Sequence, residues 1–425
     1  MKWNPFPRNG GPGRGRRFFV FNTGCVRRGL DSIRIHDFLA GNGWVSTPRI
    51  GDADLVVVTT CGAVRDNEER SLNAIREAQR RKSEDARLVV AGCLPKIRPE
   101  RIEALGPCTF IPTGELHRFD ELVGARVPIA SVPEANTLAQ NRDIYNFVIA
   151  YRLFRKLRNS ASMTELFKRL SLRPGFLRLF ALLSRIDYAL EGLTRLRLPQ
   201  RIVPYYSISI SEGCLGNCSY CCIKLATGFQ RSKPIETVVE EVREGLRKGH
   251  RHIQLVAEDT GCYGIDIGTA LPDLLEAVLA VEGDYRLILI DCNPRWLIRY
   301  RERLIPLFER HQDRIQELFF PIQSGSDAVL LRMRRHYGAG PLREALLEVR
   351  RRAPRVRLRT TVIVGFPGET EEDFQASLRL VDEVGFFEVT LNKYEDRPGA
   401  HSAGLDGHLP QEVVDRRGRD LYRHA

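Results

Sequence analysis

Hydrophobic and polar residues follow one another along the chain in a repeating order of strand and helix patterns. Near the N-terminus, short apolar runs of the kind found in strands are separated by longer stretches with helical periodicity. We expect strands at Phe18–Phe21, Asp54–Thr59 and Arg87–Ala91, and helices at Ser32–Gly41 and Asn67–Arg81. Strands that alternate with helices build a parallel sheet from βαβ units. Residues 18–130 are therefore predicted to form a Rossmann-like α/β domain.

The same order resumes after Tyr205. Six strands are expected, at Tyr206–Ile210, His252–Ala257, Leu287–Asp291, Leu318–Gln323, Leu358–Val364 and Phe387–Asn392. Helical stretches separate them, for example at Pro234–Lys248, Leu271–Val281, Arg343–Arg352 and Glu371–Val384. Six βα units form a partial version of the eight-stranded barrel, which carries its chemistry at the C-terminal ends of the strands. We therefore expect a partial (β/α)6 TIM-like barrel over residues 204–425.

A third segment, residues 131–203, lies between the two α/β regions and reads mostly as helix. Within it, Phe176–Leu196 combines an apolar stripe with several arginines. A basic amphipathic helix of this kind packs against the body of a protein, lies on a membrane surface or contacts RNA. The pattern leaves these three interpretations open.

The length and composition are those of a folded protein with two to three domains: 425 residues, 43% hydrophobic and 28% charged. No apolar run approaches the ~20 residues of a membrane-spanning helix. The apolar run that follows Arg16 and Arg17 is too short for an export signal. We therefore expect a cytoplasmic protein without a membrane span.

The formal net charge of +12 is concentrated in two segments. Residues 1–17, which we expect to be disordered, carry five basic and no acidic side chains, and residues 150–205 carry twelve basic and three acidic ones. Two basic segments on a nearly neutral body fit a polyanionic partner, most simply nucleic acid. A solubilising tail and a solvated linker would give the same pattern.

Ten cysteines in a cytoplasmic chain indicate zinc, iron–sulfur or catalytic chemistry rather than a disulfide framework. Cys214, Cys218 and Cys221 follow the first strand of the second region with the spacing C-x3-C-x2-C. Three thiolates cannot complete a four-thiolate structural zinc site. They can hold three irons of a [4Fe–4S] cluster and leave the fourth iron open to the amino and carboxylate groups of a small molecule.

Three more cysteines, Cys25, Cys61 and Cys93, each follow one of the expected N-terminal strands. If those strands are parallel, the three thiols lie at one edge of the sheet, where open α/β sheets bind their ligands. Converging thiolates of this kind predict a second iron–sulfur site, and the alternative is three unrelated cysteines. Cys108, Cys222, Cys262 and Cys292 are expected to be additional thiols outside both sets.

The second region resembles the radical S-adenosylmethionine (SAM) enzymes, whose signature is this three-cysteine spacing on this loop, with an aromatic residue such as Tyr220 before the third cysteine. The resemblance implies that a low-potential electron passes from the cluster to bound SAM. It also implies a 5′-deoxyadenosyl radical that abstracts hydrogen from an unactivated carbon.

Two three-cysteine sets in this order resemble one branch of that superfamily, the methylthiotransferases. Supporting stretches are Asp31-Ser32, Ala91–Pro95, Pro321–Ser326, Gly365–Glu369 and Tyr394–Gly399. The stretches Ile210–Gly216 and Glu258–Pro272 look like the archaeal and eukaryotic type, which methylthiolates threonylcarbamoyladenosine at position 37 of tRNA. In that family the second cluster supplies or presents the sulfur, and two SAM molecules provide the methyl group and the radical.

The resemblance implies a role for each site residue and assigns no catalytic residue beyond the cluster ligands. Cys214, Cys218 and Cys221 hold the SAM-cleaving [4Fe–4S] cluster, and Cys25, Cys61 and Cys93 hold an auxiliary one. The SAM pocket is expected to involve Tyr220, Glu258, Gln323, Ser326, Val364 and Gly365. For Gln323 and Ser326, a structural turn is the alternative. The implied partners are tRNA, a low-potential electron donor and a sulfur donor.

One departure concerns the end of the chain. The family usually ends in a small β-barrel RNA-binding module (TRAM), and this chain stops about 26 residues after Gly399. We therefore expect the basic segments to contact tRNA in its place through salt-dependent phosphate contacts. A methylthiotransferase that acts on a peptide or natural product is an alternative. A non-catalytic iron–sulfur or tRNA-binding protein is another, and the presence of all six cluster cysteines argues against it.

Overall fold

The structure, a computed structural model, describes residues 16–137 and 205–424. Within them the chain forms two compact units. The first comprises the chain up to Cys61, Asp66–Pro95 and the chain from Pro99 to residue 137. The second comprises Gly62–Arg65, Lys96–Arg98 and the chain from Tyr205 onward. Most of the basic tail expected at 1–17, and the helical insert expected at 131–203 apart from its first residues, lie outside the described residues.

The first unit is built on a five-stranded parallel sheet with the strand order β2-β1-β3-β4-β5. Its strands are β1 (Arg17–Asn22), β2 (Val45–Ser46), β3 (Leu55–Thr60), β4 (Arg87–Gly92) and β5 (Thr109–Pro112). Helices wholly or mainly in this unit are α1 (Val26–Gly41), α2 (Arg65–Arg81), α4 (Pro99–Glu103) and α5 (Arg118–Val123), and α3 (Leu94–Ile97) is divided between the two units.

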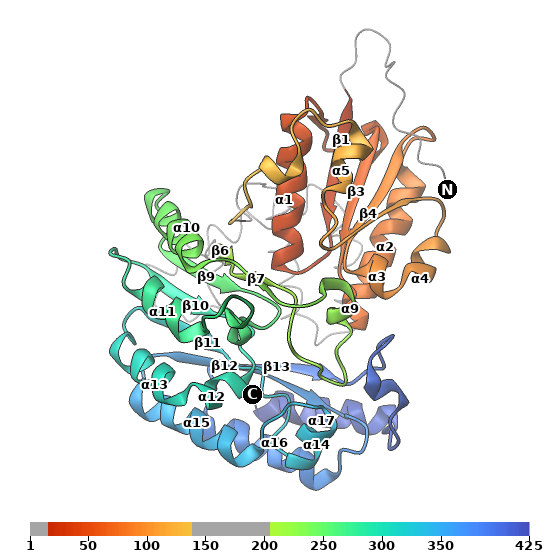
Figure 1. The fold of residues 1–425 in the computed structure, drawn as a ribbon. Coiled ribbons are helices and arrows are strands. Elements are labelled where there is room, and N and C mark those ends of the chain that lie inside the picture. Colours follow the sequence, from red (N-terminus) through yellow and green to blue (C-terminus); the bar gives the residue numbers. More distant parts are fainter. Residues whose placement is uncertain (1–15, 138–204, 425) are drawn as a thin grey trace, which may run out of the picture. The chain divides into compact units, whose positions relative to one another are not determined.

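The central strand β3 shows why this sheet is covered on both faces (Figure 1). All six of its residues are buried, as is typical of a parallel strand between two helical layers. Side chains alternate between the two faces of a strand. Val57 lies in an apolar cluster with residues of α1 and α5, whereas Val56 and Val58 lie in a second cluster with residues of α2, α3 and α4. The result is the expected α/β/α arrangement.

The second unit contains a six-stranded parallel sheet with the order β13-β12-β11-β10-β9-β6. The strands are β6 (Tyr206–Ser209), β9 (His252–Val256), β10 (Arg286–Leu289), β11 (Ile315–Phe319), β12 (Arg357–Val364) and β13 (Glu388–Lys393). Spatial neighbours are also neighbours along the chain, and helices connect them, which confirms the partial (β/α)6 barrel.

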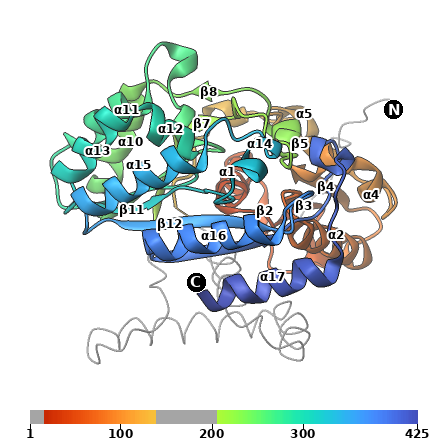
Figure 2. The same ribbon diagram turned by 90° about the horizontal axis from the view of Figure 1, so that it is seen from below.

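Most of the helices between these strands bury one face in the apolar core of the unit. They include α9 (Ile223–Thr227), α10 (Ile235–Arg247), α11 (Leu271–Leu279), α12 (Pro294–Arg299), α13 (Arg301–Arg310), α14 (Asp327–Arg332), α15 (Ala339–Arg352) and α16 (Glu371–Val384). The last helix, α17 (Gln411–His424), packs beside α16 and against β12 and β13 (Figure 2). One large apolar cluster, from Tyr206 to Leu421, forms the core of this unit.

The structure corrects several boundaries. Helix α1 begins at Val26 rather than near Ser32, which places Cys25 at its N-cap. Strands β2 and β5, two short strands at the edges of the sheet, were not expected. Strand β11 ends at Phe319 rather than Gln323, because Pro321 has no N–H to offer the ladder. None of the helices in the described ranges is both long and apolar enough to cross a membrane.

Candidate functional site: two sets of cysteines at sheet edges

The loop with Cys214, Cys218 and Cys221 follows β6 and is closed by a short antiparallel ribbon. Its strands are β7 (Ser211–Glu212) and β8 (Arg231–Ser232). Gly213 enters the loop with a φ of 78°, and a Cβ there would lie 2.0 Å from the carbonyl oxygen of Phe229. Only glycine fits that turn. The loop thereby leaves the sheet at the carboxyl end of β6, the edge at which barrels of this kind place their chemistry.

Two of these sulfurs lie on either side of a glycine. The Cys214 Sγ accepts a hydrogen bond from the Gly216 N–H at 3.1 Å. A Cβ at Gly216 would lie 3.2 Å from the Cys214 Sγ and 3.8 Å from the Cys218 Sγ. The absence of a side chain at residue 216 therefore leaves room between the two thiols. Three thiolates on one loop with such an opening fit a cluster that binds each sulfur through a different iron.

Arg335 is a buried charged residue in contact with this loop. Its guanidinium is buried and donates to the Cys218 Sγ at 3.4 Å, to the Tyr220 hydroxyl at 3.1 Å and to the Pro321 carbonyl at 2.8 Å. Burial raises the pKa of the Tyr220 phenol well above its usual value, so its hydroxyl stays protonated. The contact places a buried guanidinium directly against one of the three cysteine sulfurs.

Backbone strain is concentrated at the same edge of the second unit. Within the described residues, four residues other than glycine have positive φ: Asp291, Gln323, Arg334 and His336. Asp291 and Gln323 follow β10 and β11, and the other two flank Arg335. Such conformations cost about 1 to 3 kcal/mol each and persist where the surrounding structure imposes them, often at functional sites.

The residues expected at the SAM pocket all lie near the carboxyl ends of these strands. Gln323 is almost fully buried, and no described atom forms a hydrogen bond with its Oε1. Val364 ends β12, and Gly365 follows with a φ of 78°. Glu258 follows β9 and is half buried. Tyr220 packs at the edge of an apolar cluster that includes Met333 and Phe366.

Ser326 makes contacts that belong to the fold. Its hydroxyl donates to the Asp373 Oδ1 at 2.5 Å and accepts from the Val329 N–H at 3.4 Å, so it is the N-cap of α14. The hydroxyl is therefore engaged before any cofactor binds. The buried oxygen of Gln323, in contrast, remains available to a ligand.

Sequence reasoning missed a compact group beside Cys214. Within the described residues, one set of three candidate ligand atoms lies within 4.8 Å of one another, and it belongs to Cys214, Asp259 and Cys262. Burial raises the pKa of the Asp259 carboxyl. The contact between the two thiols lowers the pKa of Cys214 and raises that of Cys262. The Glu258–Pro272 stretch contained two of these residues, but no spacing rule connects them with Cys214.

The three N-terminal cysteines follow β1, β3 and β4, which are adjacent and parallel. Cys25 is exposed and occupies the N-cap position of α1. The buried Cys61 Sγ accepts from the Asn67 Nδ2 at 3.6 Å, and the buried Cys93 Sγ accepts from the Thr113 Oγ1 at 3.6 Å. The structure thus brings all three to one edge of the sheet, as the strand pattern predicts.

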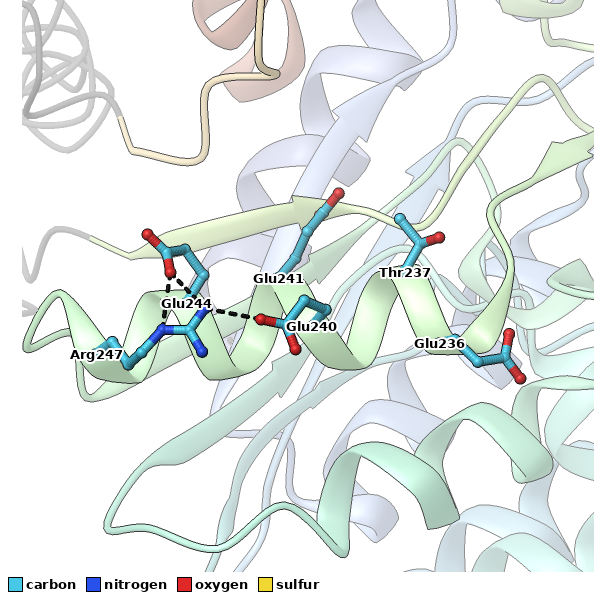
Figure 3. A pocket seen from close by; sticks show the side chains of 6 residues that line it. All are labelled: Glu236, Thr237, Glu240, Glu241, Glu244 and Arg247. Carbon is cyan, nitrogen blue, oxygen red and sulfur yellow. Dashed lines mark hydrogen bonds and ion pairs between the residues drawn. The ribbon is translucent and has the colours of Figure 1, made fainter.

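A shallow depression on the outer surface contains none of the expected site residues (Figure 3). It runs along α10 and is lined by Glu236, Thr237, Glu240, Glu241, Glu244 and Arg247. Arg247 lies 2.7 Å from the Glu240 Oε1 and 2.5 Å from the Glu244 Oε2. These exposed pairs neutralise part of its negative charge, and nothing there resembles the cysteine loop.

Comparison with known proteins bears on both units. A model of the radical SAM superfamily matches residues 208–381, and a model of the uncharacterized protein family UPF0004 matches residues 17–112. Among solved structures, the radical SAM methyltransferase TsrM from Kitasatospora setae has a TM-score of 0.57 and 14% identity, over 91% of this chain and 75% of that one. That likeness shows the fold alone.

Curated relatives extend the match to almost the whole chain. The probable threonylcarbamoyladenosine tRNA methylthiotransferase of Pyrococcus abyssi is 31% identical over 416 residues, which cover 96% of this chain and 83% of that protein. The corresponding Pyrococcus horikoshii protein is 30% identical over 413 residues with the same coverage. The human threonylcarbamoyladenosine tRNA methylthiotransferase is 29% identical, with 96% of this chain and 62% of the human protein aligned. The chain therefore belongs to the radical SAM methylthiotransferase family and is an enzyme of that type.

Proposed function

We propose that this enzyme adds a methylthio group to carbon 2 of N6-threonylcarbamoyladenosine at position 37 of tRNA. The main support for the proposal is sequence identity of about 30%, over 96% of the chain, to relatives named probable threonylcarbamoyladenosine tRNA methylthiotransferases. A tRNA substrate also fits the basic segments 1–17 and 150–205, which offer Lys and Arg to phosphates.

The proposal assigns one [4Fe–4S] cluster to each cysteine set. Cys214, Cys218 and Cys221 would hold the cluster that cleaves SAM, in a radical SAM core over residues 204–425. Cys25, Cys61 and Cys93 would hold an auxiliary cluster in a domain over residues 18–130. When bound, the clusters and SAM supply the electron transfer, hydrogen abstraction and sulfur that an unactivated C–H requires. The proposal also requires two partners, a low-potential electron donor and a sulfur donor.

The protein's own groups prepare the first of these sites. Arg335 contributes a buried N–H donor next to the Cys218 sulfur, so this ligand is held in place by the fold. The SAM pocket is proposed to be lined by Tyr220, Glu258, Gln323, Ser326, Val364 and Gly365. Gln323 would offer its buried Oε1 as a hydrogen-bond acceptor. The apolar cluster around Met333 and Phe366 would help keep water away from this edge.

Mass spectrometry of nucleosides from bulk tRNA tests the proposal. In cells that lack the gene and have no paralogue for it, we expect the 2-methylthio derivative to disappear and threonylcarbamoyladenosine to accumulate. The wild-type gene and a Cys292→Ala variant should restore the derivative, because Cys292 belongs to neither cysteine set. A Cys218→Ala variant should not restore it. An unchanged nucleoside profile in the deleted strain would exclude this substrate and favour a peptide or natural product.

A further inference from the structure

Cys262 is a buried thiol surrounded by polar atoms and lies beside the first cysteine of the SAM-cleaving set. It ends the short 3-10 helix η4 (Thr260–Cys262) after β9 and is completely buried. Its Sγ lies 3.0 Å from the Gln230 Oε1 and 3.1 Å from the Asp259 carbonyl oxygen. It also lies within 4.8 Å of the Cys214 Sγ. One S–H therefore faces three possible acceptors.

Neighbouring hydrogen bonds fix the direction in which Gln230 points. Its Nε2 donates to the Ser232 Oγ at 3.1 Å. That hydroxyl in turn accepts from the Gly264 N–H at 2.9 Å and donates to the Asp266 Oδ1 at 2.6 Å. An inverted amide would place an NH₂ group against the thiol and lose the bond to Ser232. The Gln230 oxygen is thus held toward Cys262 and can accept its S–H.

A mononuclear metal site is the competing interpretation of these atoms, and the Asp259 contacts argue against it. The Asp259 Oδ1 accepts from the Gly261 and Asn293 N–H groups, both at 3.0 Å. The Oδ2 accepts from the Trp296 Nε1 at 2.8 Å. Both oxygens are engaged in the fold, so two sulfurs alone would remain, fewer than the three or four ligands of a protein zinc site.

We propose that Cys262 is a positioning residue whose S–H donates a hydrogen bond to the Cys214 sulfur once Cys214 is a cluster ligand. This rests on the proposed assignment of Cys214, Cys218 and Cys221 to a [4Fe–4S] cluster. Iron coordination fixes Cys214 as a thiolate, which is a stronger acceptor than the neutral Gln230 oxygen or the Asp259 carbonyl. The S–H is expected to turn toward it.

The consequence is a change in redox behaviour. Hydrogen bonds to the sulfurs of an iron–sulfur cluster are one determinant of its reduction potential. A donor stabilises the reduced cluster more than the oxidised one, because reduction adds negative charge. Cys262 should therefore raise the potential of the SAM-cleaving cluster and make it easier for the electron donor to reduce.

The test is an EPR-monitored redox titration of the reconstituted full-length chain. A Cys25→Ala, Cys61→Ala, Cys93→Ala background leaves only the cluster at Cys214, Cys218 and Cys221 in the spectrum. At a fixed solution potential, Cys262→Ala should lower the ratio of reduced to oxidised cluster about threefold or more; a tenfold change would equal a shift of about 59 mV. Cys262→Ser keeps a donor and should fall closer to the parent protein.

Cys292→Ala is the matched control, because Cys292 is also completely buried in this unit and its Sγ donates to the Asn293 carbonyl at 4.0 Å rather than to a cysteine of the set. Its potential should equal that of the parent. The inference is overturned if Cys262→Ala titrates like Cys292→Ala, or if Cys262→Ser shifts as far as Cys262→Ala. Loss of iron from Cys262→Ala would also overturn it, because Cys262 would then be a ligand. If the parent background itself binds no iron, the proposed function fails instead.

Discussion

The Arg417 guanidinium lies 2.6 Å from the Glu369 carboxylate, and both side chains are almost completely buried, at 4% and 1% exposed. The same Glu369 oxygen accepts the Gly365 N–H at 2.7 Å. Arg417 belongs to α17, and Gly365 follows β12. The ion pair thus connects the last helix of the unit with the loop that the proposed SAM pocket uses.

Removal of Arg417 should leave a buried carboxylate without its partner. We expect Arg417→Ala to destabilise the protein by about 3 to 5 kcal/mol, as is typical when one half of a buried pair is deleted. Reconstituted protein that remains folded should also bind SAM more weakly, because the Gly365 loop loses its support. Chemical denaturation and equilibrium dialysis with SAM measure the two effects.

An exposed pair provides the comparison. Arg343 and Glu383 form an ion pair with side chains 50% and 38% exposed. Arg343→Ala should cost less than about 1 kcal/mol, since water screens such pairs. Equal losses of stability for Arg343→Ala and Arg417→Ala would show that burial does not determine the strength of these contacts.

Gln323 and Ser326 separate cofactor binding from fold stability. Gln323→Leu removes a buried oxygen with no described partner, and we expect the Kd for SAM to rise about tenfold, or about 1.4 kcal/mol. Ser326→Ala removes the cap of α14 and should lower stability by about 1 kcal/mol, with SAM affinity changed less than about threefold. If Ser326→Ala weakened SAM binding more than Gln323→Leu did, the hydrogen bond to SAM would come from Ser326 rather than Gln323.

Gly261 determines the position of Trp296 and, through it, of Asp259. A Cβ at Gly261 would lie 2.2 Å from the Trp296 Cδ1, so Gly261→Ala must displace the indole that donates to Asp259. Overpacking of this kind typically costs about 1 to 3 kcal/mol. Gly340→Ala is the control: Gly340 lies in α15 with no neighbour within 4 Å, so an alanine there should stabilise the protein by up to about 1 kcal/mol. Urea denaturation of both variants measures the contrast.

The fold was predictable where hydrophobic periodicity carries the signal. The apolar run of β3 indicates a buried parallel strand, and the structure buries all six of its residues. The six strand-and-helix repeats indicate the partial barrel. The two edge strands were not predicted, because both are short and lack a clear hydrophobic pattern. Strand β2 has only two residues, both exposed, and β5 has four residues and ends at Pro112. Short strands of this kind are paired by their neighbours in the sheet, not by their own sequence.

The site was predictable only as far as local spacing extends. Local spacing singles out Cys214, Cys218 and Cys221, and the strand pattern predicts that Cys25, Cys61 and Cys93 lie at one edge of the first sheet. The sequence does not show which of Arg332, Arg334 and Arg335 contacts the cysteine loop, because the partner Cys218 lies 117 residues from Arg335 along the chain. The contact of Cys262 with Gln230 spans 32 residues and depends on how the ribbon of β7 and β8 closes the loop.

Iron analysis separates the two proposed clusters. The reconstituted wild-type chain should contain about eight irons, and Cys218→Ala or Cys61→Ala about four each, because each removes a ligand of one [4Fe–4S] cluster. The double variant should contain almost none. Cys108→Ala is the control, since Cys108 belongs to neither set. Wild-type protein with only about four irons, all lost in Cys218→Ala, would contradict the auxiliary cluster and leave the SAM-cleaving assignment intact.

Salt dependence tests the role of the basic tail in tRNA binding. Five basic side chains lie in residues 1–17, and each one that neutralises a phosphate adds about 0.7 to 0.9 to the slope of log K against log salt. Replacement of all five by Gln should therefore reduce that slope by up to about four and weaken binding most at low salt. A variant with the same number of substitutions at ion-paired surface arginines, including Arg343 and Arg355, should leave the slope close to that of the wild type. An unchanged slope for the tail variant would show that residues 1–17 do not contact the tRNA phosphates. The salt dependence of binding would then come from other segments, and the basic residues of 150–205 would be the next to replace.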